Sequence, residues 1–177
     1  MFTPIKVEIT EEMIGKAEER DQGAYNSRSF MDGKGNIVGF LGEYIVQSVR
    51  PEFKHVDSFD YDFVSKNGKT IDVKTKYQTM AKEPLPYYEA SVDVNSVHQD
   101  TDCYIFCRIY KDENGNYPYG WIIGHIGKEE FLKKARRLSK GDKDGDNGYI
   151  VKQDCYNMEY QSLKKLNIHK DVLKTRK

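Results

Sequence analysis

Cysteine, net charge and long apolar runs are all scarce in this sequence. Its 177 residues include only three cysteines, and 28 acidic side chains balance 28 basic ones. A small, odd number of cysteines indicates reduced thiols rather than a disulfide framework. Zero net charge leaves no global field to attract a nucleic acid or a membrane, so a polyanion would have to bind at a local cluster of charge.

No stretch of the sequence is apolar for long enough to cross a membrane. A transmembrane helix needs about 18 or more consecutive apolar residues, and the chain contains no such run. The first residues, MFTPIKVEITEEM, also lack the apolar segment of a signal peptide. We therefore expect a cytoplasmic protein with no membrane partner.

The sequence is rich in aromatic residues, which favours a packed core over disorder. Aromatic residues make up 12% of the chain, with 13 tyrosines among them. The length suits a single domain. We expect this domain to span residues 1–177, with a helix and loop extension at 1–35, a core at 36–166 and a basic tail at 167–177.

Hydrophobic periodicity predicts both helices and strands. Apolar residues recur at helical spacing in NIVGFLGEYIVQSV, which predicts a helix of about 14 residues ending before Pro51. Acidic residues after Thr10 predict an earlier helix to about Gln22. We also expect strands at Val56–Ser65, Thr70–Tyr77, Tyr87–Val94, Cys103–Tyr110, Tyr119–Ile126 and Tyr149–Gln153, helices at Lys128–Leu138 and Met158–Leu166, and a loop at Asn26–Gly35. This order predicts an α/β (α+β) domain with one central sheet flanked by helices.

The stretch FDYDFVSKNGKTIDVKTK, Phe59–Lys76, carries an unusual charge pattern for strand-like segments. It places three aspartates and four lysines around an Asn-Gly turn. Charged residues are poor strand formers, so a purpose beyond solubility is a reasonable hypothesis. Asp72 and Lys74 alternate with Val73 and therefore point to one face of a strand.

Two turn lengths are compatible with Asn67-Gly68, and they place Asp62 on different faces. In a two-residue loop, Phe63 lies opposite Asp72 and Asp62 points to the far face. In a three-residue loop, Gly68 adopts a left-handed bulge and Asp62 lies opposite Asp72. We favour the three-residue loop because it keeps the apolar side chains of the two strands on one face.

The favoured register gathers Asp60, Asp62, Asp72 and Lys74 on one face, with Asp60 opposite Lys74. Cross-strand neighbours lie about 4.5–5.5 Å apart at Cβ. Two carboxylates this close repel each other, which raises a pKa or recruits a cation. Hard oxygen ligands at this spacing suit Mg²⁺. A surface hairpin whose charges are solvated is the alternative explanation of this segment.

These residues resemble the PD-(D/E)XK nuclease superfamily. Its signature is an acid on one strand, a hairpin, and Asp/Glu-x-Lys on the next strand, usually with a glutamate on the preceding helix. The matching residues are Glu43, Asp62, Asp72, Val73 and Lys74. Asp60 is an alternative first acid, and Tyr61 stands where the superfamily's name has proline. The similarity covers roughly Gly39–Leu166.

The resemblance implies a restriction-endonuclease-like fold, with a central mixed sheet flanked by helices. It also implies a Mg²⁺-dependent deoxyribonuclease from a bacterial cell or a phage-infected host, with Mn²⁺ able to replace Mg²⁺. Asp62, Asp72, the Val73 carbonyl and Glu43 would hold the metal. Lys74 would orient or deprotonate the attacking water, or stabilise the transition state. Whether the chain forms a homodimer stays open.

Several polar and basic residues outside the motif are candidates for substrate contact. They are Gln47, Lys76, Gln78, Arg136 and Arg137. The two arginines belong to a basic segment where a net-neutral protein would find positive charge for DNA, although a solvated helix face is an equal alternative. Gly39 and Gly42 would let one helix face approach another backbone closely. His98 and Gln99 would line the cleft in one interpretation, and we do not count them as site residues.

The expected function is that of a metal-dependent nuclease that hydrolyses phosphodiester bonds, with DNA as the expected substrate. The first alternative is a catalytically inactive domain of the same fold that binds nucleic acid or serves in an assembly. The second is an unrelated α+β interaction protein whose hairpin charges are only solvated. The presence of all four of Glu43, Asp62, Asp72 and Lys74 favours the enzyme, because degenerate copies tend to lose one of them.

Overall fold

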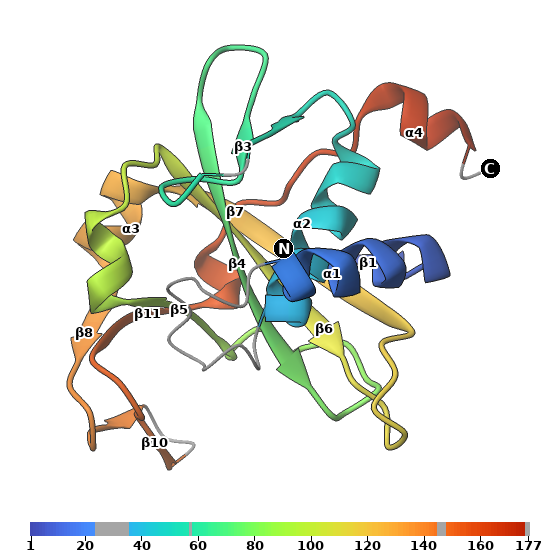
Figure 1. Cartoon of the computed structure of the whole chain (residues 1–177). Coiled ribbons are helices and arrows are strands. Elements are labelled where there is room, and N and C mark those ends of the chain that lie inside the picture. Colours follow the sequence, from blue (N-terminus) through green and yellow to red (C-terminus); the bar gives the residue numbers. More distant parts are fainter. Residues whose placement is uncertain (24–35, 57, 145–147, 176–177) are drawn as a thin grey trace.

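The fold is built around a six-stranded mixed sheet (Figure 1). A computed structural model describes residues 1–23, 36–56, 58–144 and 148–175. The strand order is β1-β7-β6-β4-β3-β2, in which β4 and β6 run parallel and the other neighbours are antiparallel. The strands are β1 Ile5–Glu8, β2 Lys54–His55, β3 Phe63–Val64, β4 Thr70–Gln78, β6 Cys103–Tyr110 and β7 Tyr119–Gly127.

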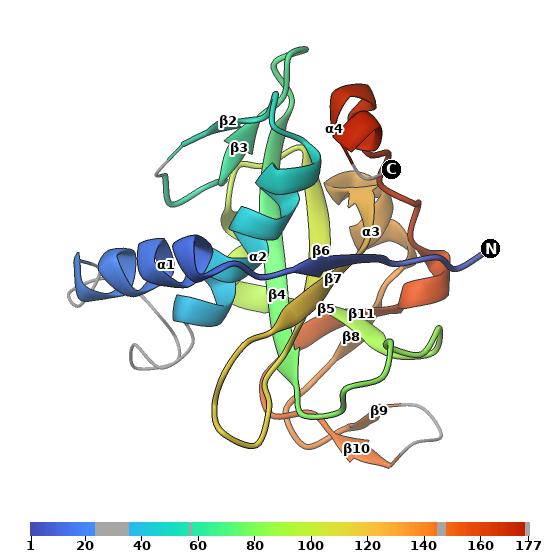
Figure 2. The ribbon, with the colours of Figure 1, turned by 90° about the vertical axis from the view of Figure 1, so that its right-hand side faces the viewer.

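A second sheet of three strands, in the order β5-β11-β8, lies beside β4 (Figure 2). These strands are β5 Glu89–Asp93, β8 Arg136–Leu138 and β11 Cys155–Glu159, and a small hairpin pairs β9 Lys143–Asp144 with β10 Tyr149–Ile150. The helices are α1 Glu11–Gly23, α2 Asn36–Val49, α3 Lys128–Lys134 and α4 Lys170–Thr175, with single 3₁₀ turns η1 Val94–His98 and η3 Tyr160–Ser162. The structure is therefore mixed α+β, with a curled mixed sheet flanked by helices.

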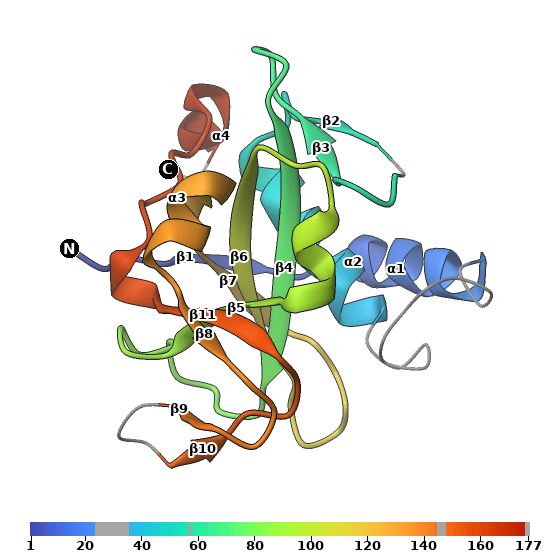
Figure 3. The same cartoon turned by 90° about the vertical axis from the view of Figure 1, so that its left-hand side faces the viewer.

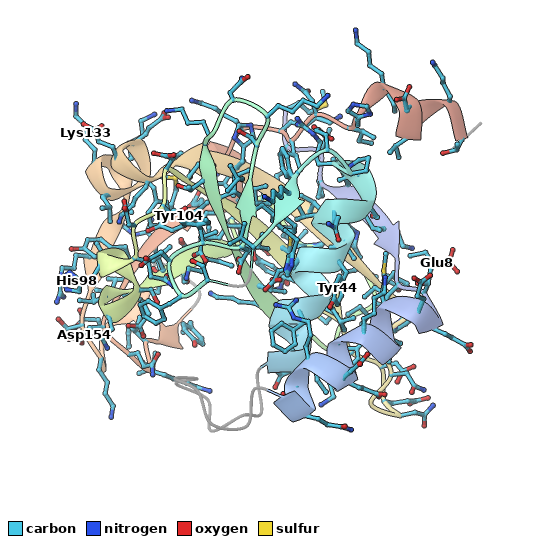
Figure 4. The ribbon with its side chains drawn as sticks, turned by 45° about the horizontal axis from the view of Figure 1, so that its top comes forward. Glu8, Tyr44, His98, Tyr104, Lys133 and Asp154 are labelled. Carbon is cyan, nitrogen blue, oxygen red and sulfur yellow. The ribbon has the colours of Figure 1, made fainter. Side chains whose placement is uncertain are left out.

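Apolar side chains form a core on each face of the six-stranded sheet. In β6, Ile105 and Cys107 pack toward α2, whereas Tyr104 and Phe106 pack toward the second sheet and α3. This alternation is typical of a strand that is buried on both faces. Figure 4 shows Tyr104 inside the molecule, between Tyr44 of α2 and His98 of η1. The central strands β4 and β6 are thus the elements that connect the two cores.

The strongest periodic signals in the sequence are confirmed. Helix α2 spans the predicted 14 residues and buries Leu41, Ile45 and Val49 on one side. The predicted helix at the N-terminus is α1, and β4, β5, β6 and β7 fall where strands are expected. Across the described residues, no helix has both the length and the apolar character that a bilayer crossing requires.

Two of the predicted helices are wrong in the C-terminal part. The helix expected at Lys128–Leu138 stops at Lys134, because Ala135 is extended and the following residues form β8. The helix expected at Met158–Leu166 is instead the end of β11 followed by η3. β11 is the middle strand of the second sheet, and its pairing with β5 and β8 outweighs the local preference of its residues.

Other boundaries also differ from the prediction. The strand expected at Val56–Ser65 is reduced to β2 and β3, because Ser58 Oγ accepts from backbone N–H groups in an intervening turn. The strand expected at Tyr149–Gln153 is only the short β10, and β1 was not predicted. The loop expected at Asn26–Gly35 lies outside the described residues.

Helix α2 approaches β4 very closely at one glycine. A Cβ atom on Gly42 would lie 1.9 Å from Thr75 Oγ1 and 2.9 Å from Thr75 Cβ. The expected close approach is confirmed for Gly42 but is wrong for Gly39, where a Cβ would meet nothing within 4 Å. The contact at Gly42 places Glu43, the next residue, close to β4.

This contact predicts opposite effects for the same substitution at two positions of α2. Gly42→Ala forces a methyl group into Thr75 and should lower the free energy of unfolding by about 1–3 kcal/mol. Gly39→Ala has room and should raise it by up to about 1 kcal/mol, because alanine is the better helix former. Urea unfolding of both variants checks this, and equal effects at the two positions would show that α2 does not pack as described.

Candidate active site

The turn between β3 and β4 has the three-residue form that the sequence favours. Gly68 has a φ of 78°, a left-handed conformation that glycine adopts without the steric strain of a Cβ. Phe63 pairs with Ile71 across the hairpin. The register therefore sets Asp62 opposite Asp72, and this prediction is confirmed.

Asp62 extends the pairing of β3 with β4 through its side chain. Its backbone N–H donates to the Ile71 carbonyl at 2.9 Å, and its Oδ2 accepts from the Val73 N–H at 2.7 Å. The N–H and C=O of one strand residue point to the same side of the strand. The Val73 carbonyl is therefore directed to the edge of β4 on which Asp62 lies.

Asp72 and Lys74 form an ion pair on one face of β4. Asp72 is 5% exposed, and its Oδ2 lies 2.6 Å from Lys74 Nζ. Among the described residues, this buried oxygen has no partner at hydrogen-bonding angles. The close charge compensates the carboxylate, and the oxygen keeps a lone pair for a further ligand.

Gln99 connects Lys74 to two other segments of the chain. Its Oε1 accepts from Lys74 Nζ at 2.9 Å, and its Nε2 donates to the Phe59 carbonyl at 2.5 Å. Its backbone carbonyl accepts from Lys128 Nζ at 2.5 Å. These bonds hold the amide oxygen that Lys74 contacts. No local pattern identifies this role, because Gln99 is 25 residues from Lys74 in the sequence.

Burial and like charge act on the two aspartates together. Burial, and then the negative charges of Glu43 and Asp72, raise the pKa of Asp62 well above its ordinary value. Burial also raises the pKa of Asp72, although the neighbouring Lys74 ammonium opposes this rise. Two carboxyl groups held in this way favour a shared proton or a bound cation over two free negative charges.

Glu43 is buried on α2, and two basic side chains hold its carboxylate. Its Oε2 accepts from Arg20 Nη1 at 2.8 Å and lies 2.8 Å from His55 Nε2. The Arg20 guanidinium also lies over the Phe40 ring, 3.9 Å from its centroid. Sequence reasoning missed Arg20 and His55, which come from α1 and β2 and share no motif with Glu43.

Asp60, the alternative first acid, does not lie opposite Lys74, and that prediction is wrong. The chain turns away before this position, where Ser58 Oγ accepts from the Asp60 N–H at 3.1 Å. Asp60 Oδ1 instead accepts from the Asp100 N–H at 3.2 Å. Asp62 is therefore the acid of the hairpin that faces β4.

Gln78 is a structural residue rather than a surface ligand. It is 8% exposed, and its Oε1 accepts from Arg108 Nε at 3.0 Å. Its Nε2 donates to the carbonyls of Met80 and Lys82 at 2.6 and 2.7 Å. Because these contacts occupy its amide inside the protein, the predicted contact with substrate is not supported.

Arg136 and Arg137 lie on β8 rather than on a helix. Arg136 Nη2 contacts Glu89 Oε1 at 2.6 Å and Asp144 Oδ1 at 2.8 Å, and Asp144 is 2% exposed. Arg137 Nη2 lies 3.9 Å from Asp154 Oδ2. Arg136 therefore holds the second sheet together. Figure 1 shows this region far from α4 in the basic tail, so the two basic segments do not form one surface.

Gln47 and Lys76 keep their predicted placement. Gln47 is partly buried, one turn after Glu43 on α2, and Lys76 is exposed, two residues after Lys74 on the same face of β4. Their contact with substrate stays a prediction.

The acidic cluster suits Mg²⁺ through a small number of ligands. In the part of the chain that the structure describes, no three His, Cys, Asp or Glu side chains are arranged to hold a metal ion. Mg²⁺, however, usually takes one or two carboxylates, together with waters and substrate phosphates. Asp62, Asp72 and the Val73 carbonyl meet this requirement. Glu43 stands beside them with its carboxylate already in contact with Arg20 and His55.

Comparisons with known proteins do not assign the chain to a family. No family model matches the sequence, and no curated protein matches it either. Its function must therefore be inferred from the geometry and charge of the site.

The crowding of carboxyl groups predicts that Asp62→Asn stabilises the metal-free protein. Asparagine keeps an acceptor for the Val73 N–H and removes a buried acid, so the free energy of unfolding in EDTA at pH 8 should rise by on the order of 1 kcal/mol, the equivalent of about one pKa unit. The matched control is Asp60→Asn, which should change it by less than about 0.5 kcal/mol. A loss of stability in Asp62→Asn would contradict the repulsion described here.

Proposed function

We propose that this chain is a metal-dependent nuclease of the PD-(D/E)XK type that hydrolyses phosphodiester bonds in DNA. One observation carries the proposal: the hairpin register sets Asp62 opposite Asp72, and Lys74 lies 2.6 Å from the Asp72 carboxylate. Two buried acids and a lysine of this kind are expensive to maintain in a core. A structural role alone does not require them.

The arrangement of the elements supports a restriction-endonuclease-like fold. Helix α2, which carries Glu43, packs against β4, and β4 carries Asp72, Val73 and Lys74 in the middle of the mixed sheet. The hairpin of β3 and β4 precedes a parallel partner strand, β6. This is the order of elements that the motif in the sequence implies.

Asp62, Asp72 and the Val73 carbonyl would hold Mg²⁺, with Glu43 as a further acid. When bound, the metal would acidify water and offset the charge that develops on the phosphate. The protein itself supplies Lys74 next to the acids. An ammonium has three N–H donors, and the contacts to Asp72 and Gln99 leave one for a phosphate oxygen or the attacking water. Gln99 fixes the direction in which that donor points.

One observation favours the catalytically inactive alternative. The Glu43 carboxylate is already bound by Arg20 and His55, so it is not free to complete a metal site without displacing them. A domain that only binds nucleic acid or assembles with a partner would retain this arrangement. Cleavage and metal binding, measured together, separate the two functions.

The nuclease proposal predicts cleavage of plasmid or oligonucleotide DNA in Mg²⁺ or Mn²⁺ and none in EDTA. Asp72→Ala and Lys74→Ala should each reduce the rate at least about 100-fold, the usual scale for removal of an acid–base group. Lys66→Ala removes an exposed lysine from the turn of the same hairpin and should leave the rate unchanged. Absence of cleavage of every DNA and RNA tested, together with absence of calorimetric Mg²⁺ and Mn²⁺ binding, would rule out the enzyme.

The contact with Lys74 predicts a positioning role for Gln99. Gln99→Ala should lower kcat about 10- to 100-fold through misplacement of the ammonium, with little change in KM and with an altered pH profile of kcat. The control is His98→Ala, which changes the exposed neighbouring residue and should leave both parameters unchanged. If Gln99→Ala shows the wild-type kcat and pH profile, the contact has no catalytic consequence.

A further inference from the structure

A polar cavity adjoins the candidate active site on the Lys74 side. Its volume is about 390 Å³, and it lies between β4 and the second sheet, whose neighbouring positions are visible in Figure 3. Its wall includes Lys74, Lys76, Ser91, Tyr149, Lys152 and Gln153. Because Lys74 belongs to both the cavity and the acidic cluster, a ligand in the cavity would lie next to the proposed scissile phosphate.

The cavity has positive charge that the protein does not neutralise. Lys76 Nζ donates to two neutral groups, Ser91 Oγ at 2.6 Å and the Glu89 carbonyl at 3.2 Å. Neither Lys76 nor Lys152 forms a salt bridge with a described residue. The acids on the wall are engaged elsewhere: Glu89 with Arg136, and Asp93 as the N-cap of η1.

Lys76 is surrounded by protein on several sides although its side chain is open to the cavity. Burial, and then the positive charge of Arg108, lower the pKa of Lys76 to about 8. At pH 7 the amine is still mostly protonated. A phosphate beside it would favour the protonated form further, so the site is suited to an anion.

An exposed aromatic side chain stands at the cavity wall. Tyr149, on β10, is 51% exposed, and Phe106 and Tyr160 form buried parts of the same wall. Nucleic-acid bases stack on aromatic side chains of this kind in proteins that bind single strands. Lysines for phosphate and a tyrosine for a base together define the chemistry of a nucleotide.

We propose that this cavity receives one unpaired nucleotide of the substrate strand, with its phosphate near Lys76 and its base against Tyr149. The inference rests on the proposed nuclease function and adds a preference for single-stranded or frayed DNA. The volume is near the lower end of the range for small-ligand sites, about 300–1,000 Å³. It accommodates one nucleotide and excludes a base pair, so a nucleotide has to leave the duplex to enter.

The test measures binding in EDTA, where metal-dependent cleavage does not interfere. Fluorescence anisotropy compares a labelled single-stranded oligothymidylate with a blunt hairpin duplex that contains the same number of phosphates. The single strand should bind at least about tenfold more tightly. Tyr149→Ala should weaken its binding roughly tenfold, as expected for loss of one stacked base, and Tyr149→Phe should retain it. Lys76→Gln should weaken it and reduce its salt dependence.

The control variant is Tyr87→Ala, which removes a tyrosine that is 52% exposed and lies outside the cavity wall. It should bind the single strand as the wild type does, and thermal melting of all the variants verifies that they are folded. Equal affinity for the two DNAs, or wild-type affinity in folded Tyr149→Ala, would overturn the cavity proposal. If the protein still cleaves DNA in Mg²⁺, the nuclease function stands without it. Failure to bind either DNA, together with failure to cleave, would overturn both.

Discussion

The hydrogen bond from the Val73 N–H to Asp62 Oδ2 lies at the place where β3 separates from β4. A β-strand whose neighbour ends would present an unsatisfied N–H group inside the protein, which is unfavourable. The Asp62 carboxylate takes the place of the missing backbone. In doing so it is held at the edge of β4, beside the Val73 carbonyl and opposite Asp72. The left-handed Gly68 sets the register on which this replacement depends.

The same arrangement places negative charge where the protein cannot easily solvate it. Asp62, Asp72 and Glu43 act on one another electrostatically, and the protein offsets them with nearby basic groups of Lys74, Arg20 and His55. The compensation differs between the acids. Glu43 has two partners at 2.8 Å, whereas Asp72 has the Lys74 ammonium nearby and a buried oxygen without a hydrogen-bond donor among the described residues. The aspartate pair, rather than Glu43, is therefore the place where a cation would gain most.

Local patterns were sufficient to predict the hairpin and α2, but not the contacts between distant segments. The turn register could be inferred because only one alternative keeps Phe63 and Ile71 on the same face. Helix α2 was predicted because its apolar residues repeat at helical spacing. By contrast, β11 owes its form to pairing with β5 and β8, and Arg20 meets Glu43 only because α1 packs on α2. Neither fact has a signal in the nearby sequence. Asp60 was misplaced because a turn at Ser58 ends the strand earlier than its residues indicate.

Strand β4 connects the acidic cluster to the cavity through its period of two. Asp72, Lys74, Lys76 and Gln78 follow one another along one face at about 6.6 Å intervals, twice the rise of about 3.3 Å per strand residue. Their surroundings differ in order along the strand: an acid pair, an ammonium held by Gln99, an ammonium without a counter-ion, and a buried amide that fixes Arg108. Successive phosphates of a single strand are spaced on a similar scale. A strand of DNA aligned with β4 would therefore meet Lys74 at one phosphate and Lys76 near the next, which is why the catalytic group and the proposed nucleotide site belong to one surface.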